Sequence, residues 1–259
     1  MRQVLVVHFS QTGQLDRLVR SVCAPLEKAS GVQVDYLPLQ PAQPFPFPWP
    51  FLGFFRIFPE TVLMRPAPLL PLQVDADKRY DLIILAYQVW FLSPSLPVTS
   101  FLASPEAARL FKDTPVVTLI GCRNMWLMAQ EKVKAKLTEL GARLVDNIAL
   151  TDACGTAASF LATPLWMFTG RQKPYAWVPR AGIEEREIDA ASRFGEAMAQ
   201  RLAGDALPVS EPIVVPAVSL PPESPLPVPM PLPTAPQPAL PSLSPSAPSP
   251  ALPSSGEVR

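Results

Sequence analysis

The stretch that decides the fold is Val4-Leu5-Val6-Val7-His8-Phe9-Ser10-Gln11-Thr12-Gly13-Gln14. A short apolar run rich in valine stops at hydroxyl residues and a glycine, and an amphipathic segment, Leu15–Lys28, follows at once. The run predicts a strand that is covered on both faces, as in a parallel sheet. The loop and the helix start that follow it offer free backbone N–H groups, two hydroxyls and the positive end of a helix dipole, which together favour an anion.

Strand and helix patterns alternate along the chain after this first unit. Such alternation predicts an α/β fold with a doubly wound parallel sheet of five strands. We expect strands at Val4–Phe9, Val32–Leu37, Tyr80–Tyr87, Pro115–Ile120 and Arg143–Thr151. We expect helices at Leu15–Lys28, at Val98–Phe111 in two pieces broken near Ser104-Pro105, at Met125–Leu140 and at Glu184–Leu202.

Two stretches depart from this alternation. Residues 39–72 form a long insertion of alternating proline and aromatic residues, in which Phe51–Phe58 has room for about two helical turns. Asp152–Arg180 has no single period and predicts an apolar, partly helical excursion. A loop as long and apolar as the insertion is usually functional. It either covers a sheet edge and contributes to the core, or forms a wall for an apolar substrate or a membrane-contacting lip.

The composition divides the chain into residues 1–204 and a proline-rich tail. Seventeen of the 35 prolines lie in 205–259, among Ala, Ser, Leu and Val. This tail has too little apolar surface to offset its chain entropy, so we expect a disordered segment with polyproline II character. It serves as a flexible spacer or, through PxxP-type sequence, recruits a partner.

Charge and cysteine usage exclude several classes of function. Residues 1–204 hold 21 basic and 18 acidic residues, a balance far too small to indicate nucleic-acid binding. Three widely spaced cysteines and a single histidine argue against a disulfide framework or a zinc site, so no metal is expected. We find neither a signal-peptide pattern nor an apolar run long enough for a transmembrane helix, and we expect a cytoplasmic protein.

Three loops follow strands of the predicted sheet at the edge where ligands bind in such folds. They are Ser10–Gln14, Gln88–Pro94 and Gly121–Asn124. The first suits a phosphate, the second carries an aromatic ring and the third carries polar groups. This combination fits a phosphorylated planar cofactor better than a sugar phosphate or a metal.

The same loops resemble those of a known superfamily. Ser10-x-Thr12-Gly13 is similar to the phosphate loop of flavodoxins, which bind FMN, and Tyr87-Gln88-Val89-Trp90 resembles the ring-stacking loop of flavodoxin-like quinone reductases. Gly121-Cys122-Arg123-Asn124 resembles the loop that touches the polar edge of the ring. The resemblance covers residues 1–202 and implies a flavodoxin-like fold. It also implies cofactor-binding roles for Ser10, Gln11, Thr12, Gly13, Gln14, Gln88, Val89, Trp90, Phe91, Gly121, Cys122, Arg123 and Asn124.

A closer resemblance is to bacterial dialkylresorcinol condensing enzymes. It rests on Phe45–Phe51, on Tyr87–Pro97 and on Gly121–Trp126. The family implies a role in making alkylated aromatic lipids, in which a ketosynthase joins two acyl chains into a cyclohexanedione that is then oxidised to a resorcinol. The tail lies outside the resemblance.

The function expected from these features is an FMN-dependent oxidoreductase that aromatises an alkylated cyclic diketone. Arg123, which would stabilise an enolate or reduced flavin, and Tyr87, as an acid or base, are the catalytic candidates. The alternatives are purely structural roles: a surface salt bridge for Arg123, core packing for Tyr87 and Trp90, and ordinary helix caps for Thr12 and Asn124.

Other functions stay open alongside this one. The main alternative is a flavodoxin-like scaffold without redox activity that serves a lipid ketosynthase in the condensing step. An electron-transfer flavodoxin is disfavoured, because such carriers are usually acidic. The expected partners are an apolar alkylated substrate, a ketosynthase, a second copy in a homodimer and peripheral contact with a membrane.

Overall fold

The computed structural model describes residues 1–204 apart from 76, 123–124, 152–155, 174 and 179. All of them belong to one of the two units into which the chain divides, Met1–Leu220; the other, Pro221–Arg259, lies outside the described residues. The strands are β1 (Arg2–His8), β2 (Val32–Pro38), β3 (Leu82–Trp90), β4 (Ser93–Pro94), β5 (Pro115–Cys122) and β6 (Arg143–Thr151). The helices are α1 (Gln14–Lys28), α2 (Phe51–Arg56), α3 (Phe58–Val62), α4 (Leu96–Leu102), α5 (Pro105–Phe111), α6 (Leu127–Glu139), α7 (Thr156–Thr169) and α8 (Glu185–Ala203).

Five strands form a parallel sheet in the order β2-β1-β3-β5-β6, and the short β4 pairs antiparallel with β3. Counted without β4, this is the 2-1-3-4-5 order of the flavodoxin-like doubly wound fold, in which the chain reverses direction across the sheet between its first and third strands. The predicted fold class is therefore confirmed. Each of the five expected strands is present. Most strand ends lie one to three residues from the expected position, and the others coincide with it.

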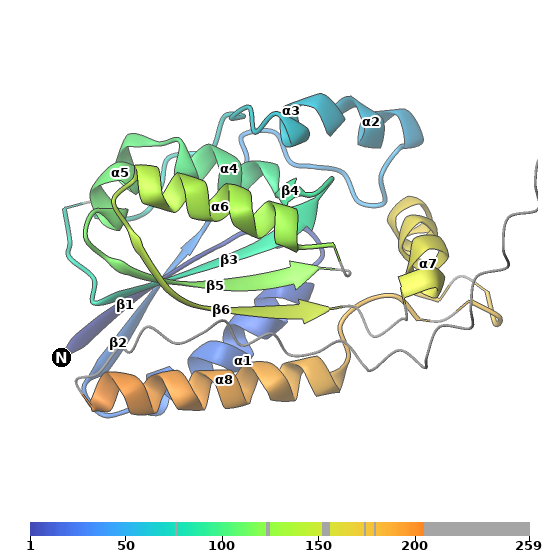
Figure 1. Ribbon diagram of the computed structural model, residues 1–259. Coiled ribbons are helices and arrows are strands. Elements are labelled where there is room, and N and C mark those ends of the chain that lie inside the picture. The colour runs from blue at the N-terminus through green and yellow to red at the C-terminus, as the bar shows by residue number, and fades with distance from the viewer. Residues whose placement is uncertain (76, 123–124, 152–155, 174, 179, 205–259) are drawn as a thin grey trace, which may run out of the picture. The chain divides into compact units, whose positions relative to one another are not determined.

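The apolar residues of β1 alternate between two cores, one on each face of the sheet. Leu5 and Val7 pack in the core that the helices α4, α5 and α6 cover. Val4 and Val6 pack in the core beneath α1 and α8. Figure 1 shows the two helix layers above and below the sheet. This double covering is why the strand reads as a continuous apolar run rather than an alternating one.

The layer formed by α1 and α8 is packed very closely. A Cβ atom on Gly195 of α8 would lie 2.1 Å from the carbonyl oxygen of Val22 on α1. Only glycine permits this approach of the two backbones, so Gly195 sets the distance between the helices. The salt bridge between Arg201 and the buried Asp146 ties the far end of α8 to β6, with an N–O distance of 2.6 Å.

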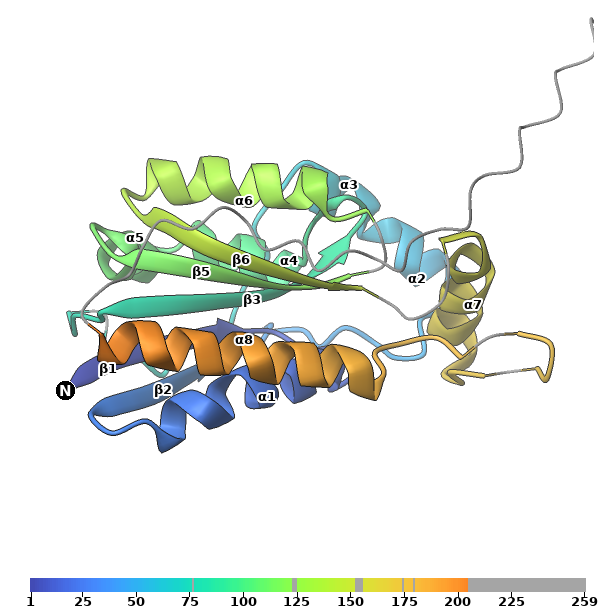
Figure 2. The same ribbon diagram turned by 60° about the horizontal axis from the view of Figure 1, so that its bottom comes forward.

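The insertion and the excursion both contain helices that sit at the carboxyl edge of the sheet. The insertion forms α2 and α3, in agreement with the two helical turns expected there, and the excursion forms α7. Figure 2 shows α2 and α7 beyond the carboxyl ends of the strands. Among the described residues, none of the helices combines the length and the apolar character needed to cross a bilayer.

The predicted break in the helical segment Val98–Phe111 is also confirmed. Pro105 begins α5 one residue after Ser104, whose hydroxyl accepts a hydrogen bond from the N–H of Ala107. A serine cap followed by proline at the first helical position is a strong start signal, which made this boundary readable. The predicted tail, 205–259, lies outside the described residues, so its disorder and the domain boundary at 204 stay predictions.

Candidate functional site

The loop between β1 and α1 presents an uncapped helix N-terminus. Gly13 precedes α1 with φ of 76° and makes no side-chain cap hydrogen bond. This left-handed conformation costs glycine nothing and would strain any other residue. The ordinary-cap alternative for the hydroxyls of this loop is therefore wrong, and the first N–H groups of α1 remain available to an anion.

Two hydroxyl oxygens in the same loop are buried without a partner. Ser10 Oγ and Thr12 Oγ1 have no hydrogen-bond partner. Burying a hydroxyl in this way costs about 1–3 kcal/mol. Such a cost at two positions in one loop indicates a group that the hydroxyls bind, and an oxyanion at the start of α1 meets that requirement.

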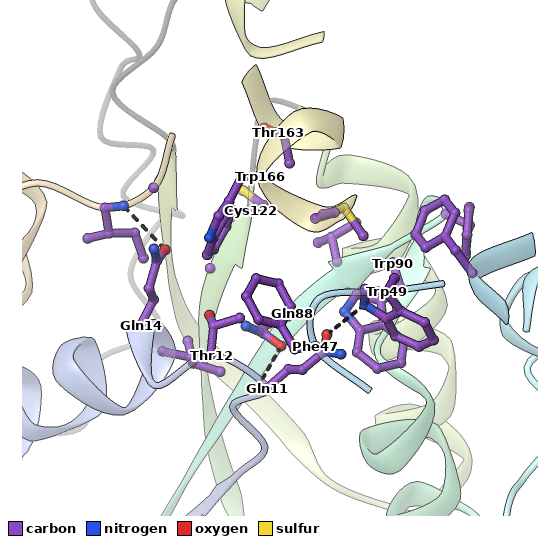
Figure 3. Close-up of a pocket in the computed structure, with 18 of the residues that line it drawn as sticks. Gln11, Thr12, Gln14, Phe47, Trp49, Gln88, Trp90, Cys122, Thr163 and Trp166 are labelled. Carbon is purple, nitrogen blue, oxygen red and sulfur yellow. Dashed lines mark hydrogen bonds between the residues drawn. The ribbon is translucent and has the colours of Figure 1, made fainter. Parts of the chain in front are cut away.

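Gln11 connects this loop by hydrogen bonds to the end of β3 and to the insertion. Its backbone N–H donates to Gln88 Oε1 at 3.4 Å, and its Nε2 donates to the carbonyl oxygen of Pro46 at 3.0 Å. Its Oε1 accepts from Trp49 Nε1 at 3.3 Å. Figure 3 shows Gln11 between Gln88 and Trp49. The side chain predicted to bind a cofactor thus joins the loop to the insertion.

Gln14 fastens the other side of the loop. Its Oε1 accepts from the N–H of Ile183 at 3.3 Å, just before α8. A Cβ atom on Gly182 would lie 2.4 Å from Gln14 Nε2, so the backbone of this segment passes directly over the amide. The amide of Gln14 therefore fills the space between the start of α1 and the segment that leads into α8.

The loop after β3 is a tight hairpin rather than the open loop expected from the sequence. β3 continues to Trp90 and pairs with β4 through Val89–Pro94 and Trp90–Ser93. The two residues at the turn, Phe91 and Leu92, have φ of 46° and 60°. A two-residue hairpin with a type I′ turn needs positive φ at both central positions, which glycine, asparagine or aspartate normally supply. Here bulky apolar residues hold the strained turn, a feature that clusters at functional sites.

Ring contacts hold this hairpin in place. Phe91 meets Phe54 of α2 and Phe58 of α3, with centroid distances of 4.7 and 5.0 Å. Trp90 meets Phe45 and Trp49 edge to face, at 5.1 and 6.0 Å. Edge-to-face pairs of this kind contribute about 0.5–1.5 kcal/mol each beyond their burial. The hairpin and the insertion therefore form one aromatic assembly.

Helix α7 packs against the same assembly from the far side. The N–H of Trp49 donates to the carbonyl oxygen of Met167 at 2.8 Å. Phe47 meets Trp166 with a centroid distance of 5.5 Å, and Phe54 meets Phe168 at the same distance. These contacts place the insertion between the sheet edge and α7.

The end of β5 contributes a glycine and a thiol. A Cβ atom on Gly121 would lie 3.1 Å from Leu15 Cδ1, so the strand end is close to the start of α1. Burial raises the pKa of the Cys122 thiol to about 12. Its Sγ lies 3.8 Å from the carbonyl oxygen of Leu150. At neutral pH Cys122 is therefore a neutral, weakly polar contact and not a thiolate.

These elements enclose a cavity of about 330 Å³ at the carboxyl edge of the sheet (Figure 3). This is within the size range of small-molecule sites. The only ionisable group among its described lining residues is the Cys122 thiol. The cavity is lined by Gln11, Thr12, Gln14, Leu15, Phe47, Trp49, Phe54, Ile57, Gln88, Val89, Trp90, Phe91, Leu92, Gly121, Cys122, Met125, Thr163, Trp166, Met167, Gly182 and Ile183.

Most of the predicted site residues converge on this cavity. Lining residues that were predicted from the sequence are Gln11, Thr12, Gln14, Gln88, Val89, Trp90, Phe91, Gly121 and Cys122. Ser10 and Gly13 lie in the adjoining loop and do not line it. Arg123 and Asn124 lie outside the described residues. The cofactor-binding roles of all these residues stay predictions.

The prediction for Tyr87 is corrected. Its side chain is fully buried in the core beneath α4, α5 and α6 and does not line the cavity. Its hydroxyl donates to Gln130 Oε1 at 2.6 Å, and Gln130 Nε2 donates to Thr118 Oγ1 at 2.9 Å. Burial holds the pKa of Tyr87 well above its usual range. Tyr87 is thus part of a buried polar network that joins β3 and β5 to α6, and not an acid or base.

The residues that the sequence missed come from α7 and from the segment before α8. Thr163, Trp166, Met167, Gly182 and Ile183 line the cavity although none follows a strand. The apolar run of the excursion was the only signal for Thr163, Trp166 and Met167, and Gly182 and Ile183 lie beyond it. Within the described part of the chain, no group of three or more His, Cys, Asp or Glu residues is placed to hold a metal ion.

Comparison with known proteins gives no family. No family model matches the chain. No curated protein matches it either. Among solved structures, similarity is found to a flavoprotein in complex with FMN from Lactobacillus acidophilus NCFM, at 12% identity, 57% of this chain, 93% of that chain and a TM-score of 0.46.

Two further structures give similar values. A flavodoxin from the domain Archaea shares 12% identity over 78% of this chain and 99% of that chain, with a TM-score of 0.44. A putative flavoprotein from Bacteroides eggerthii shares 16% identity over 55% of this chain and 86% of that chain, with a TM-score of 0.45. Likeness at this level carries no argument about function, and the fold assignment rests on the strand order of the chain itself.

Proposed function

We propose that this protein binds FMN and acts as a flavin-dependent oxidoreductase. The observation that carries the proposal is the pair of buried hydroxyl oxygens, Ser10 Oγ and Thr12 Oγ1, that lack partners beside an uncapped helix N-terminus. Their donors and the backbone N–H groups of α1 match a phosphate monoester. The aromatic wall of the cavity beside them matches a planar ring.

The residues present fit this cofactor in three places. Ser10, Thr12 and the N–H groups after Gly13 would hold the phosphate. Trp90, already fixed by its ring contacts, would face the ring system, and Cys122 would touch it as a neutral group. When bound, FMN supplies an acceptor for a hydride equivalent. The described residues position and desolvate the ligand, since none that lines the cavity is charged at neutral pH.

The substrate class that we propose is an alkylated cyclic diketone, or a related quinone-like precursor of a dialkylresorcinol lipid. The mostly apolar lining supports a substrate with alkyl chains. Each CH₂ group that is buried there contributes about 0.8 kcal/mol of favourable transfer free energy to binding. Aromatisation removes one hydrogen from the ring as a proton and one as a hydride. The high pKa of Cys122 disfavours a role of this thiol in acyl condensation, which needs a thiolate nucleophile.

The proposal is tested by titrating purified protein with FMN and following flavin absorbance and fluorescence. We expect a bound, spectrally shifted flavin. Thr12→Val removes one hydroxyl at nearly constant volume and weakens binding roughly 10–100-fold, as expected for a hydrogen bond to a charged group. The matched control is Thr138→Val on the exposed face of α6, where the hydroxyl donates to the carbonyl oxygen of Lys134. This variant binds FMN like the parent protein.

Protein that stays colourless after incubation with excess FMN contradicts the proposal. That result would favour the alternative, a flavodoxin-like scaffold that assists a lipid ketosynthase. Thr12→Glu separates the two functions in a reconstituted pathway. A carboxylate in the phosphate position abolishes the activity of a flavoenzyme, whereas a scaffold keeps it.

A further inference from the structure

The helices of the insertion expose a set of large apolar side chains to solvent. Leu52 is 76% exposed and Phe51 is 63% exposed, both in the first turn of α2. Phe55, Phe58 and Leu63 are also largely exposed. Single exposed apolar residues are ordinary, but a cluster on two successive short helices marks an interaction surface. We call this set, Phe51, Leu52, Phe55, Phe58 and Leu63, the insertion face.

The insertion face adjoins residues that line the cavity. Phe54 of α2 and Ile57, between α2 and α3, are sequence neighbours of its members and line the cavity wall. Met125 also lines the cavity and is exposed, and Leu127 and Met128 in the first turn of α6 are exposed apolar residues as well. The same short helices thus contact the cavity on one side and solvent on the other.

An aromatic pair lies on the loop that follows α7. Tyr175 and Trp177 stack with an interplanar angle of 11°, and Trp177 is 70% exposed. Tryptophan and tyrosine are enriched where an apolar body meets a polar headgroup layer. Contact of Phe51 with Phe168 connects α7 to the insertion face, with a centroid distance of 5.5 Å.

The charges around these apolar residues are mostly positive. Arg56 and Arg65 lie within the insertion, and Arg171, Lys173 and Arg180 follow α7; all five are exposed. The acidic residue within the same two segments, 51–72 and 169–180, is Glu60, whose side chain is half-buried. Arg56, Arg65, Arg171 and Lys173 form no salt bridge within the described part of the chain.

We propose that the insertion face and its basic surroundings bind the surface of an anionic lipid bilayer. Apolar residues flanked by exposed arginine and lysine are the pattern of helices that lie in a membrane interface. Anionic headgroups complement the excess of positive charge, whereas a second copy of the same face would bring these cations against each other. This inference goes beyond the proposed redox function and does not depend on flavin binding.

Membrane binding at this face gives the cavity a direct source of apolar ligand. Phe54, Ile57 and Met125 line the cavity and adjoin the face that would rest on the bilayer. An alkylated molecule dissolved in the bilayer would then reach the site without crossing water.

The test uses the full chain and co-sedimentation with vesicles of phosphatidylcholine, with or without phosphatidylglycerol. We expect binding to the mixed vesicles that falls as salt increases. Arg56→Glu/Arg65→Glu lowers the partition coefficient at least tenfold, because each basic residue near the surface contributes about fivefold. The matched control is Arg79→Glu/Lys112→Glu. It makes the same change in net charge at exposed positions that precede β3 and β5, at the opposite edge of the sheet, and keeps binding to within about twofold.

The apolar contribution is tested separately. Leu52→Ser/Phe55→Ser lowers binding to the mixed vesicles about tenfold or more, whereas Tyr36→Ser, which removes an exposed ring from β2, leaves it unchanged. Failure of the parent protein to sediment with the mixed vesicles overturns the proposal. A dimer that forms through this face, in a protein that does not bind vesicles, also overturns the proposal. Light scattering would detect such a dimer, and Leu52→Ser/Phe55→Ser would abolish it.

Discussion

At the scale of single residues, two glycines have nearly the same positive φ but lie at opposite edges of the sheet. Gly13 and Gly31 have φ of 76° and 78°, and a Cβ atom on either would meet no atom within 4 Å. Gly13 starts α1 at the carboxyl edge of the sheet, whereas Gly31 precedes β2 at the opposite edge. The space beside Gly13 is where the proposed phosphate would lie, and the space beside Gly31 is solvent.

This pair gives a test with a built-in control. Gly13→Ala and Gly31→Ala each lower the free energy of unfolding by about 1–2 kcal/mol, because both force alanine into the left-handed region. Only Gly13→Ala also weakens FMN binding. Urea unfolding and flavin titration of the two variants provide the measurements. Equal FMN affinity in both would remove the loop before α1 from the site.

The position of Thr12 beside the cavity could be inferred from the sequence, whereas that of Tyr87 could not, for one physical reason. Thr12 follows a strand that ends where its apolar run ends, so its position could be inferred. The strand with Tyr87 continues to Trp90, beyond the apolar run. Tyr87 therefore lies inside the sheet and packs with Leu85 in the core beneath α4, α5 and α6, and the strand residues that line the cavity come after it.

At the scale of elements, an antiparallel bridge between Pro41 and Leu69 closes the base of the insertion, and ring contacts hold its helices. Phe54 is the centre of the insertion, with contacts to Trp49, Phe55, Phe91 and Phe168 at centroid distances of 5.9, 5.3, 4.7 and 5.5 Å. It joins α2 to the hairpin and to α7. The neighbouring Phe55 is half exposed and provides a comparison of equal size.

Phe54→Ala should therefore loosen the insertion as a unit. We expect a loss of about 1.5–3 kcal/mol in stability and cleavage by protease within residues 39–72. Phe55→Ala should cost less than about 1 kcal/mol and leave the cleavage rate unchanged. Limited proteolysis followed by mass spectrometry locates the cuts. Similar cleavage in both variants would argue against Phe54 as the anchor.

The order of the elements was more predictable than their contacts. Alternating strand and helix patterns indicated the doubly wound sheet, since parallel connections follow a fixed hand. The hairpin of β3 and β4 was missed because Phe91-Leu92 has no turn signal, and tertiary contacts impose its backbone. The pairing of the insertion with α7 depends on rings far apart in the sequence, which no local pattern specifies.

At the scale of the whole molecule, buried thiols make stability depend on pH. Burial raises the pKa of Cys23, which is fully buried, from 9.0 to about 12. Above pH 9 the unfolded chain therefore loses this proton while the folded chain keeps it. The stabilisation is complete below pH 9 and is lost as the pH rises toward 12.

We expect the free energy of unfolding to fall through this window by about 1.4 kcal/mol per pH unit from Cys23 alone. Urea unfolding at a series of alkaline pH values measures the slope. Cys23→Ala is less stable throughout because of the cavity that it leaves, but its slope is shallower by that amount. An unchanged slope would show that the thiol titrates alike in both states.

The distance in sequence between the insertion and α7 has a consequence for synthesis. Ribosomes release Phe47, Trp49 and Phe54 long before Trp166 and Phe168 exist to cover them. The nascent chain therefore carries an aromatic segment whose partners in α7 are absent throughout the translation of β3, β5 and β6. A holding chaperone that binds such segments, supplied during expression, should raise the yield of soluble protein.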